Sequence, residues 1–310
     1  MESFYQNIPD FAALTRKLSA ICGECIPAEL FSVGKSVLGR ELWAVGFSHR
    51  RGAVVYAGGF HAQEWITVLL LTCFLEELAQ AVTKRENICG ILPHQAMRGR
   101  GVIILPCANP DGLELVANGT ESAGLYKSAV EEISRGDLTG WNANVRGVDI
   151  NHNFDAGFVQ VKRMEEENGI TAPAKRQYGG ETPESEPETR ALCNLCRMYR
   201  PSRLVAFHSQ GEEIYYDYGK NTPVKSRAVA DYWASLCGYT VCAPTGMASH
   251  GGFKDWFIQE FGAQGFTLEV GLGTNPLPAD DLPQIYAKLK AMLIYGLFGC
   301  ENLTDIGVFG

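Results

Sequence analysis

Short apolar runs bounded by glycine or proline alternate along the chain with longer segments of helical spacing. In residues 31–37 and 41–47 apolar and polar positions alternate, and a Leu-Gly-Arg turn separates the two segments, which predicts an opening β-hairpin. The later apolar runs are continuous, which is typical of strands buried on both faces of a parallel or mixed sheet. These runs are residues 53–56, 102–105, 204–207, 239–242 and 266–270.

Amphipathic segments with the period of a helix lie between these runs. They are residues 64–81, 187–199, 223–237, 252–261 and 282–298. Pro283 fits the first turn of its helix, where a backbone N–H has no partner to lose. The alternation predicts an α/β protein with one sheet between two helical layers, in a single domain that spans residues 1–310.

Composition narrows the class of protein. The 310 residues are 46% apolar and 20% charged, as in ordinary globular proteins, and the net charge is −8. This acidic balance argues against nucleic acid as a partner. The longest apolar stretches, residues 65–75 and 291–300, are about half of the roughly 20 residues that cross a bilayer, so no membrane association is expected. Residues 1–10 do not resemble a secretory signal, which predicts a cytoplasmic location.

Ten cysteines are scattered from Cys22 to Cys300, and we expect them to be reduced thiols. Two CxxC pairs, Cys22/Cys25 and Cys193/Cys196, have the spacing of zinc ligands and together could hold one ion. The alternative is that the second pair is buried as free thiols within its helix. Spacing alone does not decide between the two interpretations.

Polar residues follow the predicted strands where those strands end. His61 and Glu64 come after residues 53–56 and open a helix, and a turn can direct two such side chains toward one divalent ion. His208 follows residues 204–207 and could supply a third ligand, which leaves one position for water. The alternative for the first pair is a capping glutamate beside a hydrogen-bonded histidine.

Two further residues have candidate catalytic roles. Glu269 lies in an apolar strand, where a carboxylate needs a partner, so it is either a general base near a metal-bound water or half of an ion pair. Arg146 lies in a polar segment, residues 144–155, and its guanidinium could stabilise an oxyanion. The alternative for Arg146 is a structural ion pair with a nearby carboxylate.

Taken together, the HxxE motif at His61, the strand-ending His208, the segment from Arg146 to Phe154 and the Phe-Thr-Leu-Glu269 strand resemble the zinc carboxypeptidases of the carboxypeptidase A superfamily. The resemblance extends from about residue 33 to residue 289. It implies a three-layer α/β/α sandwich around a mixed, mostly eight-stranded sheet. It also implies one catalytic Zn²⁺ bound by His61, Glu64 and His208, and a zinc-activated water with Glu269 as its general base.

The sequence departs from this family at three positions. The family's oxyanion arginine usually follows a tryptophan, whereas Asn142 follows Trp141 here, so Arg146 is a candidate of our own. Where the family has Asn-Arg, with the arginine bound to the C-terminal carboxylate of the substrate, this chain has Asn151 and His152. Imidazole lacks the two-pronged donor of a guanidinium. Met247 stands where the family has a substrate-contacting tyrosine.

Residues 151–158, 249–257 and 269–277 are similar to a bacterial branch, the γ-D-glutamyl-meso-diaminopimelate peptidases. This resemblance implies hydrolysis of the γ-D-glutamyl amide in murein tri- or tetrapeptides. Asn151 and His152 are candidate substrate-binding residues, although His152 could instead support its neighbours through hydrogen bonds. Arg190 or Arg163 could replace the missing arginine. The alternatives are a metallocarboxypeptidase of broader specificity, a zinc-dependent N-acyl amino acid deacylase, and a binding protein with an inactive site.

Overall fold

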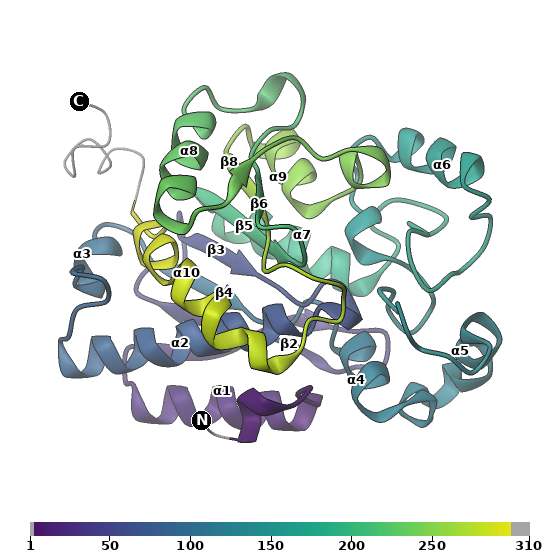
Figure 1. The fold of residues 1–310 in the computed structure, drawn as a ribbon, viewed down its shortest axis with the longest axis horizontal. Helices are drawn as coiled ribbons and strands as arrows, with labels where there is room; N and C mark the ends of the chain where they lie inside the picture. Colours follow the sequence, from purple (N-terminus) through teal and green to yellow (C-terminus); the bar gives the residue numbers. More distant parts are fainter. Residues whose placement is uncertain (1–2, 299–310) are drawn as a thin grey trace.

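A single mixed sheet of eight strands forms the centre of the computed structural model, which describes residues 3–298 (Figure 1). Cys300, one of the ten cysteines, lies outside the described residues. The strand order is β1-β2-β4-β3-β5-β8-β6-β7. The strands are β1 Ala28–Lys35, β2 Glu41–Phe47, β3 Val54–Ala57, β4 Val102–Leu105, β5 Arg203–His208, β6 Glu213–Tyr215, β7 Thr240–Val241 and β8 Gln264–Glu269.

The sheet changes from antiparallel to parallel toward its middle. β1 and β2 form the predicted antiparallel hairpin, and β2 is also antiparallel to β4. The strands β4, β3, β5 and β8 are parallel to one another. The carboxyl ends of β3, β5 and β8 therefore meet at one edge of the sheet, where ligands of open α/β sheets bind. This is the edge where the candidate residues that follow these strands are found.

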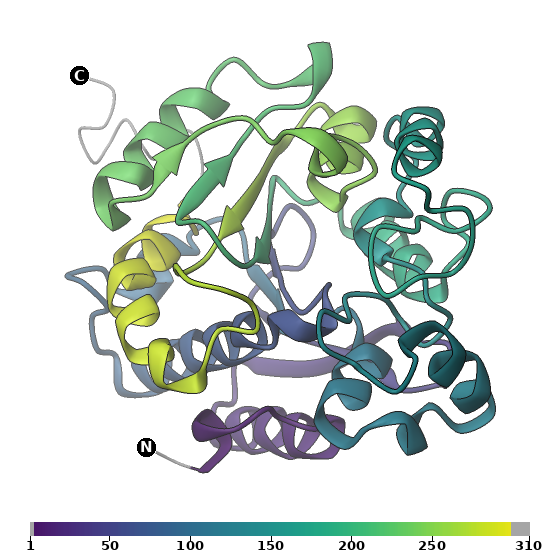
Figure 2. The ribbon, with the colours of Figure 1, turned by 45° about the vertical axis from the view of Figure 1, so that its right-hand side comes forward.

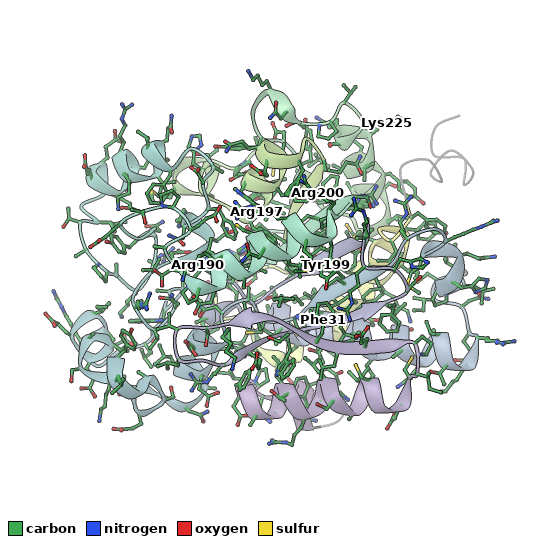
Figure 3. The ribbon with its side chains drawn as sticks, turned by 180° about the vertical axis from the view of Figure 1, so that it is seen from behind. Phe31, Arg190, Arg197, Tyr199, Arg200 and Lys225 are labelled. Atoms are coloured by element: carbon green, nitrogen blue, oxygen red, sulfur yellow. The ribbon has the colours of Figure 1, made fainter. Side chains whose placement is uncertain are left out.

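Ten α-helices lie within the described residues and cover both faces of the sheet. Side chains of α1, α2, α8 and α10 share one hydrophobic core, and those of α7 and α9 share another on the opposite face, which confirms the predicted three-layer arrangement (Figures 1 and 3). In Figures 1 and 2, α4, α5 and α6 gather on one side of the molecule. The helices are α1 Phe11–Glu24, α2 Ile66–Lys84, α3 Pro93–Ala96, α4 Pro110–Asn118, α5 Lys127–Ser134, α6 Phe158–Glu167, α7 Pro187–Tyr199, α8 Ser226–Cys237, α9 Phe253–Phe261 and α10 Leu282–Tyr295.

The two cores are separated by the alternation of side chains along the strands. In β3, Val54 and Tyr56 face the core of α2 and α10, whereas Val55 and Ala57 face the core of α7 and α9. The same division settles the question of the CxxC pairs. Cys25 is buried in the first core with Cys22 packed against it, and Cys193 and Cys196 are buried in the second core. The two pairs lie on opposite faces of the sheet, so they do not form a four-cysteine zinc site.

Helix α2 is the central helix of the first core. With the short turn before it, the segment Ala62–Lys84 is long and apolar enough to cross a membrane by length and composition alone. In this structure α2 packs against α1 and α10, which cover its apolar surface. Twelve side chains of α2 are buried inside the protein, so its hydrophobicity is that of a core helix.

Candidate active site

Three of the predicted site residues lie together at the carboxyl edge of the sheet. The Nδ1 atom of His61 is 2.9 Å from Glu64 Oε1, and the Nδ1 atom of His208 is 3.2 Å from Glu64 Oε2. One ligand atom from each residue lies within 4.8 Å of the other two, and within residues 3–298 this is the one group of three such side chains that could hold a metal ion. We call His61, Glu64 and His208 the metal cluster.

The turn between β3 and α2 directs the first two members inward. Gly59 has a φ of 62°, and a Cβ atom there would lie 2.9 Å from the backbone of Cys107, so a side chain is excluded. The hydroxyl of Thr67 accepts from the Gly59 N–H at 2.9 Å and donates to the Glu64 carbonyl at 2.8 Å. These bonds fix the short 3₁₀ turn Ala62–Glu64, on which Glu64 is buried, with 5% of the residue exposed.

Asp149 supports the metal cluster from outside. Its Oδ1 atom is 3.0 Å from His61 Nε2, the ring nitrogen that faces away from Glu64. The carboxylate of Asp149 also accepts from the Asn151 N–H at 3.2 Å and the Gln177 N–H at 2.9 Å. The sequence analysis did not single out this aspartate, although its position before a short polar turn was a usable signal. A carboxylate on the second nitrogen of a histidine is the usual support of a metal ligand, because it fixes the tautomer and the ring orientation.

The charges of the metal cluster are those of a cation site. Burial alone would lower the pKa of His61, but Glu64 and Asp149 raise it well above its ordinary value. Burial opposes ionisation of Glu64, yet the two imidazoles lower its pKa to about 2. Burial lowers the pKa of His208, which favours the neutral ring that binds metals. Two carboxylates thus surround His61 with an excess of negative charge that a bound cation would neutralise.

The donor atoms fit zinc. Two imidazoles and one carboxylate are an established ligand set for catalytic zinc, which keeps a fourth position open. Ligand atoms at about 2.0–2.2 Å from a tetrahedral ion are about 3.4 Å apart. The nitrogen–oxygen distances of 2.9 and 3.2 Å in the cluster are close to that separation. The His208 ring also stacks on Phe60, with 5.0 Å between ring centroids, which holds its direction.

Glu269 is the last residue of β8 and pairs in register with His208 at the end of β5. Registered residues of neighbouring strands project to the same face, so the carboxylate lies on the side of the sheet that carries the His208 ring. Within the described residues its oxygens have no hydrogen-bond partner, and burial, together with the charges of Glu64 and Glu213, raises its pKa well above the ordinary value. A carboxylate whose basicity is increased in this way is suited to act as a general base.

The two candidate substrate residues have different surroundings. His152 is 7% exposed, its Nε2 atom is 2.9 Å from the Met247 carbonyl, and its Nδ1 atom is 3.3 Å from Asp149. These contacts are those of the alternative interpretation, in which His152 supports its neighbours. Asn151 is partly exposed and accepts from the Phe253 N–H at 3.1 Å through Oδ1. Its role in binding substrate stays a prediction.

The candidate arginines lie elsewhere. The guanidinium of Arg146 is 3.5 Å from Glu186 and 3.3 Å from the Tyr126 hydroxyl, and its side chain is 40% exposed. Within the described residues no contact joins Arg146 to the metal cluster, so its contacts are those of a structural ion pair and do not support an oxyanion role. Arg190 lies on α7 at the back of the molecule, where it donates to the carbonyls of Glu184 and Ser185 (Figure 3). Arg163 is exposed on α6.

The fold and the metal cluster together define a metal-dependent hydrolase with an α/β sheet. Residues 26–291 match the protein family described as "Zinc carboxypeptidase", and the chain belongs to this family. It is a zinc peptidase, as the resemblance in the sequence predicted.

Two curated bacterial proteins are similar to this chain over most of its length. Identity to the "Uncharacterized protein YqgT" of Bacillus subtilis (strain 168) is 33% over 94% of this chain and 78% of that protein. Identity to "Gamma-D-glutamyl-L-diamino acid endopeptidase 1" of Lysinibacillus sphaericus is 32% over 86% of this chain and 66% of that protein. The crystal structure of thrombin activatable fibrinolysis inhibitor has the same fold, with a TM-score of 0.73 and 18% identity over 96% of this chain and 78% of that one.

Proposed function

We propose that this zinc peptidase hydrolyses the amide between γ-D-glutamate and diaminopimelate in murein tri- or tetrapeptides. The proposal rests on the surroundings of the two ring nitrogens of His152. Its Nε2 atom lies 2.9 Å from the Met247 carbonyl oxygen, and its Nδ1 atom, 3.3 Å from Asp149, is enclosed by the protein, so neither nitrogen is accessible to a plain C-terminal carboxylate. The similarity to a γ-D-glutamyl-L-diamino acid endopeptidase supports the same conclusion. A cytoplasmic location stays a prediction of the sequence.

The side chains have separate tasks in the proposed reaction. His61, Glu64 and His208 would hold the zinc, which would supply Lewis-acid chemistry to the scissile carbonyl and to a water molecule. Glu269 accepts a proton from that water as it attacks the carbonyl carbon. The same carboxylic acid then donates the proton to the leaving amine nitrogen, so that the C–N bond breaks and diaminopimelate leaves as an amine. Asp149 keeps the His61 ring in the orientation that binds metal.

The test is product analysis by mass spectrometry. The protein is incubated with L-Ala-γ-D-Glu-meso-diaminopimelate, with the same peptide linked through the α-carboxyl of glutamate, with a blocked dipeptide that ends in a free aromatic residue, and with an N-acyl amino acid. We expect L-Ala-D-Glu and diaminopimelate from the first peptide and slower cleavage of the other three. The signal should vanish when a chelator removes the zinc.

Three outcomes would overturn the proposal. Cleavage of the blocked dipeptide alone would identify a metallocarboxypeptidase of ordinary specificity, and cleavage of the N-acyl amino acid alone would identify a deacylase. A zinc-loaded protein that cleaves none of the four would be a binding protein with an inactive site.

A further inference from the structure

Asn142 lies beside the turn that carries two residues of the metal cluster. Its backbone carbonyl accepts from the Ala62 N–H at 3.2 Å, and the carbonyl of the preceding Trp141 accepts from the Gln63 N–H at 3.0 Å. The backbone of residues 141–142 therefore runs alongside residues 62–63, between His61 and Glu64 in the sequence. The side chain of Asn142 is 6% exposed, so a polar group is buried next to the metal cluster.

Among the described residues, one of the two polar atoms of the Asn142 side chain has a hydrogen-bond partner and the other has none. Gln63 Nε2 donates to Asn142 Oδ1 at 2.7 Å, which engages the oxygen. No described residue accepts from the other end of the amide, Nδ2. This nitrogen is also absent from the set of fully enclosed polar atoms without a partner, so it opens on accessible space. The amide thus presents a neutral hydrogen-bond donor beside the turn that carries His61 and Glu64.

The position of Asn142 is fixed on several sides. Its N–H donates to the Lys175 carbonyl at 2.8 Å, and Asn109 Nδ2 donates to its carbonyl at 3.3 Å. The neighbouring Trp141 is fully buried, and its indole N–H donates to the Ala143 carbonyl at 2.9 Å. A donor held in this way needs little reorganisation during a reaction, which is the property that makes preorganised donors effective in catalysis.

We propose that Asn142 is a catalytic residue, and that its Nδ2 donates a hydrogen bond to the scissile carbonyl oxygen as that oxygen gains negative charge. Gln63 is the positioning residue, because its bond to Oδ1 fixes the orientation in which the amide presents Nδ2. Asn142 thereby takes the role that the sequence analysis gave to Arg146, whose guanidinium contacts Glu186 and Tyr126 instead. The ligand is an amide carbonyl and its tetrahedral oxyanion.

The inference rests on hydrolysis by the zinc peptidase and not on the identity of the murein peptide. The assays use whichever of the four substrates the wild-type protein cleaves, so a wrong substrate leaves the test intact. Removal of one oxyanion donor typically lowers kcat by about 100- to 1,000-fold. We expect this loss in Asn142→Ala, with a change in KM of less than about threefold and with zinc content unchanged.

A second variant separates the donor from the fold. Asn142→Asp keeps an oxygen that can accept from Gln63 but replaces the N–H donor with an acceptor, so kcat should fall at least as far as in Asn142→Ala. Gln63→Met frees the Asn142 amide to rotate and should lower kcat by about tenfold while the donor remains. Asn118→Ala on the exposed end of α4 is the matched control and should retain wild-type kinetics.

Binding provides a readout that does not depend on turnover. A phosphinic peptide, which imitates the tetrahedral oxyanion, should bind Asn142→Ala more weakly by the same factor as the loss in kcat, whereas the amine product should bind as well as before. Wild-type kcat in Asn142→Ala, or equal weakening of the phosphinic peptide and the product, would overturn the assignment. A large loss in Arg146→Ala with little loss in Asn142→Ala would return the role to Arg146.

Discussion

Two buried clusters of ionisable side chains meet the polar loop of residues 141–153, and only one of them has the features of a metal site. The metal cluster meets this loop through Asp149, which contacts His61. The second cluster, Asp111, Glu186 and Glu188, meets it through Asn144, whose Nδ2 donates to Glu186 at 2.8 Å and lies 3.4 Å from Glu188. We call these three carboxylates the acidic cluster.

Burial is similar in the two clusters, so it does not distinguish them. They differ in the groups that neutralise their charges. Asp111 is 1% exposed and accepts from Arg40, the Ser36 hydroxyl and the Leu38 N–H, so its oxygens are occupied. In the metal cluster the partners of Glu64 include the two imidazoles, and one ligand atom from each of the three residues lies within 4.8 Å of the others. Burial and charge are therefore common to structural and functional sites, whereas convergence of donor atoms marks the site that takes an ion.

The largest expected effect is the loss of turnover in the variant Glu269→Gln. The substitution keeps the shape of the side chain but removes the general base, which typically lowers turnover by about 100- to 10,000-fold. Zinc content and the unfolding midpoint should stay at wild-type values, since Glu269 is not a member of the metal cluster. Activity is measured on the cleaved substrate, and zinc by atomic absorption.

The neighbouring carboxylate provides the control for this prediction. Glu213 pairs in register with Glu269 across the sheet, and its side chain accepts from the Tyr215 hydroxyl. Glu213→Gln keeps the base in place but removes one charge that raises its pKa, so turnover should stay within about tenfold and the acid limb of the pH profile should shift to lower pH. Equal losses in both variants would mean that the local negative charge matters and that Glu269 has no specific role as a base.

Smaller effects, on zinc affinity and on stability, are expected when Asp149 beside the metal cluster or Asp111 in the acidic cluster loses its charge. Asp149→Asn weakens the support of His61 and should lower zinc affinity by about 10- to 100-fold, as is typical when the hydrogen-bond partner of a metal ligand is changed. Asp111→Asn should leave zinc affinity unchanged but reduce the free energy of unfolding by about 2 kcal/mol, because Arg40 and two other donors lose a charged acceptor. Competition with a chelator measures the first quantity, and urea unfolding measures the second. Equal zinc affinities in the two variants would contradict the distinction between the clusters.

The metal cluster was accessible to sequence analysis because its residues follow strands that end at a common edge. The direction of a side chain is fixed there by the strand and by the turn after it, so His61, Glu64 and His208 could be placed together before the structure was known. The central strands and the helices α2, α7, α8, α9 and α10 were also predicted, because their patterns are regular, whereas α1 and α6 were not. The three-residue strand β6 was not, since a run as short as Glu-Ile-Tyr has no detectable period.

The loop of residues 141–153 could not be interpreted in the same way. Asn142, Arg146, Asp149 and His152 are close in sequence, yet turns between them direct Asp149 inward and Arg146 outward. One of these turns is at Gly147, which has a φ of 74°. Residue types indicate what a side chain can do, but in an irregular segment only the tertiary structure shows which partner it meets. Asn142 was noticed only as a departure from the family, because an amide is the least conspicuous of these groups.

The prediction with the least effect on the metal cluster concerns how stability depends on pH, and it belongs to the acidic cluster. Burial raises the pKa of Glu188 to about 8, and the nearby Asp111 and Glu186 act in the same direction. In the unfolded chain a glutamate has a pKa of about 4.3. Below that pH the group is protonated in both states, so its full contribution to stability is present. As pH rises toward 8, the unfolded state loses its proton first, and the free energy of unfolding falls by up to about 1.4 kcal/mol per pH unit.

Glu188→Gln removes this titration, so the free energy of unfolding of the variant should fall less steeply than that of the wild type between pH 5 and pH 8. Urea unfolding at pH 5, 6, 7 and 8 measures the difference, and Glu86→Gln on the exposed surface controls for the loss of one carboxylate. Zinc affinity should not change in either variant, because Glu188 contacts Val37 and Asn144 and no member of the metal cluster. Parallel curves for Glu188→Gln and the wild type would show that Glu188 is ionised in the folded protein. The acidic cluster would then hold a further negative charge without a bound cation, and the distinction drawn from convergent donor atoms would need another physical basis.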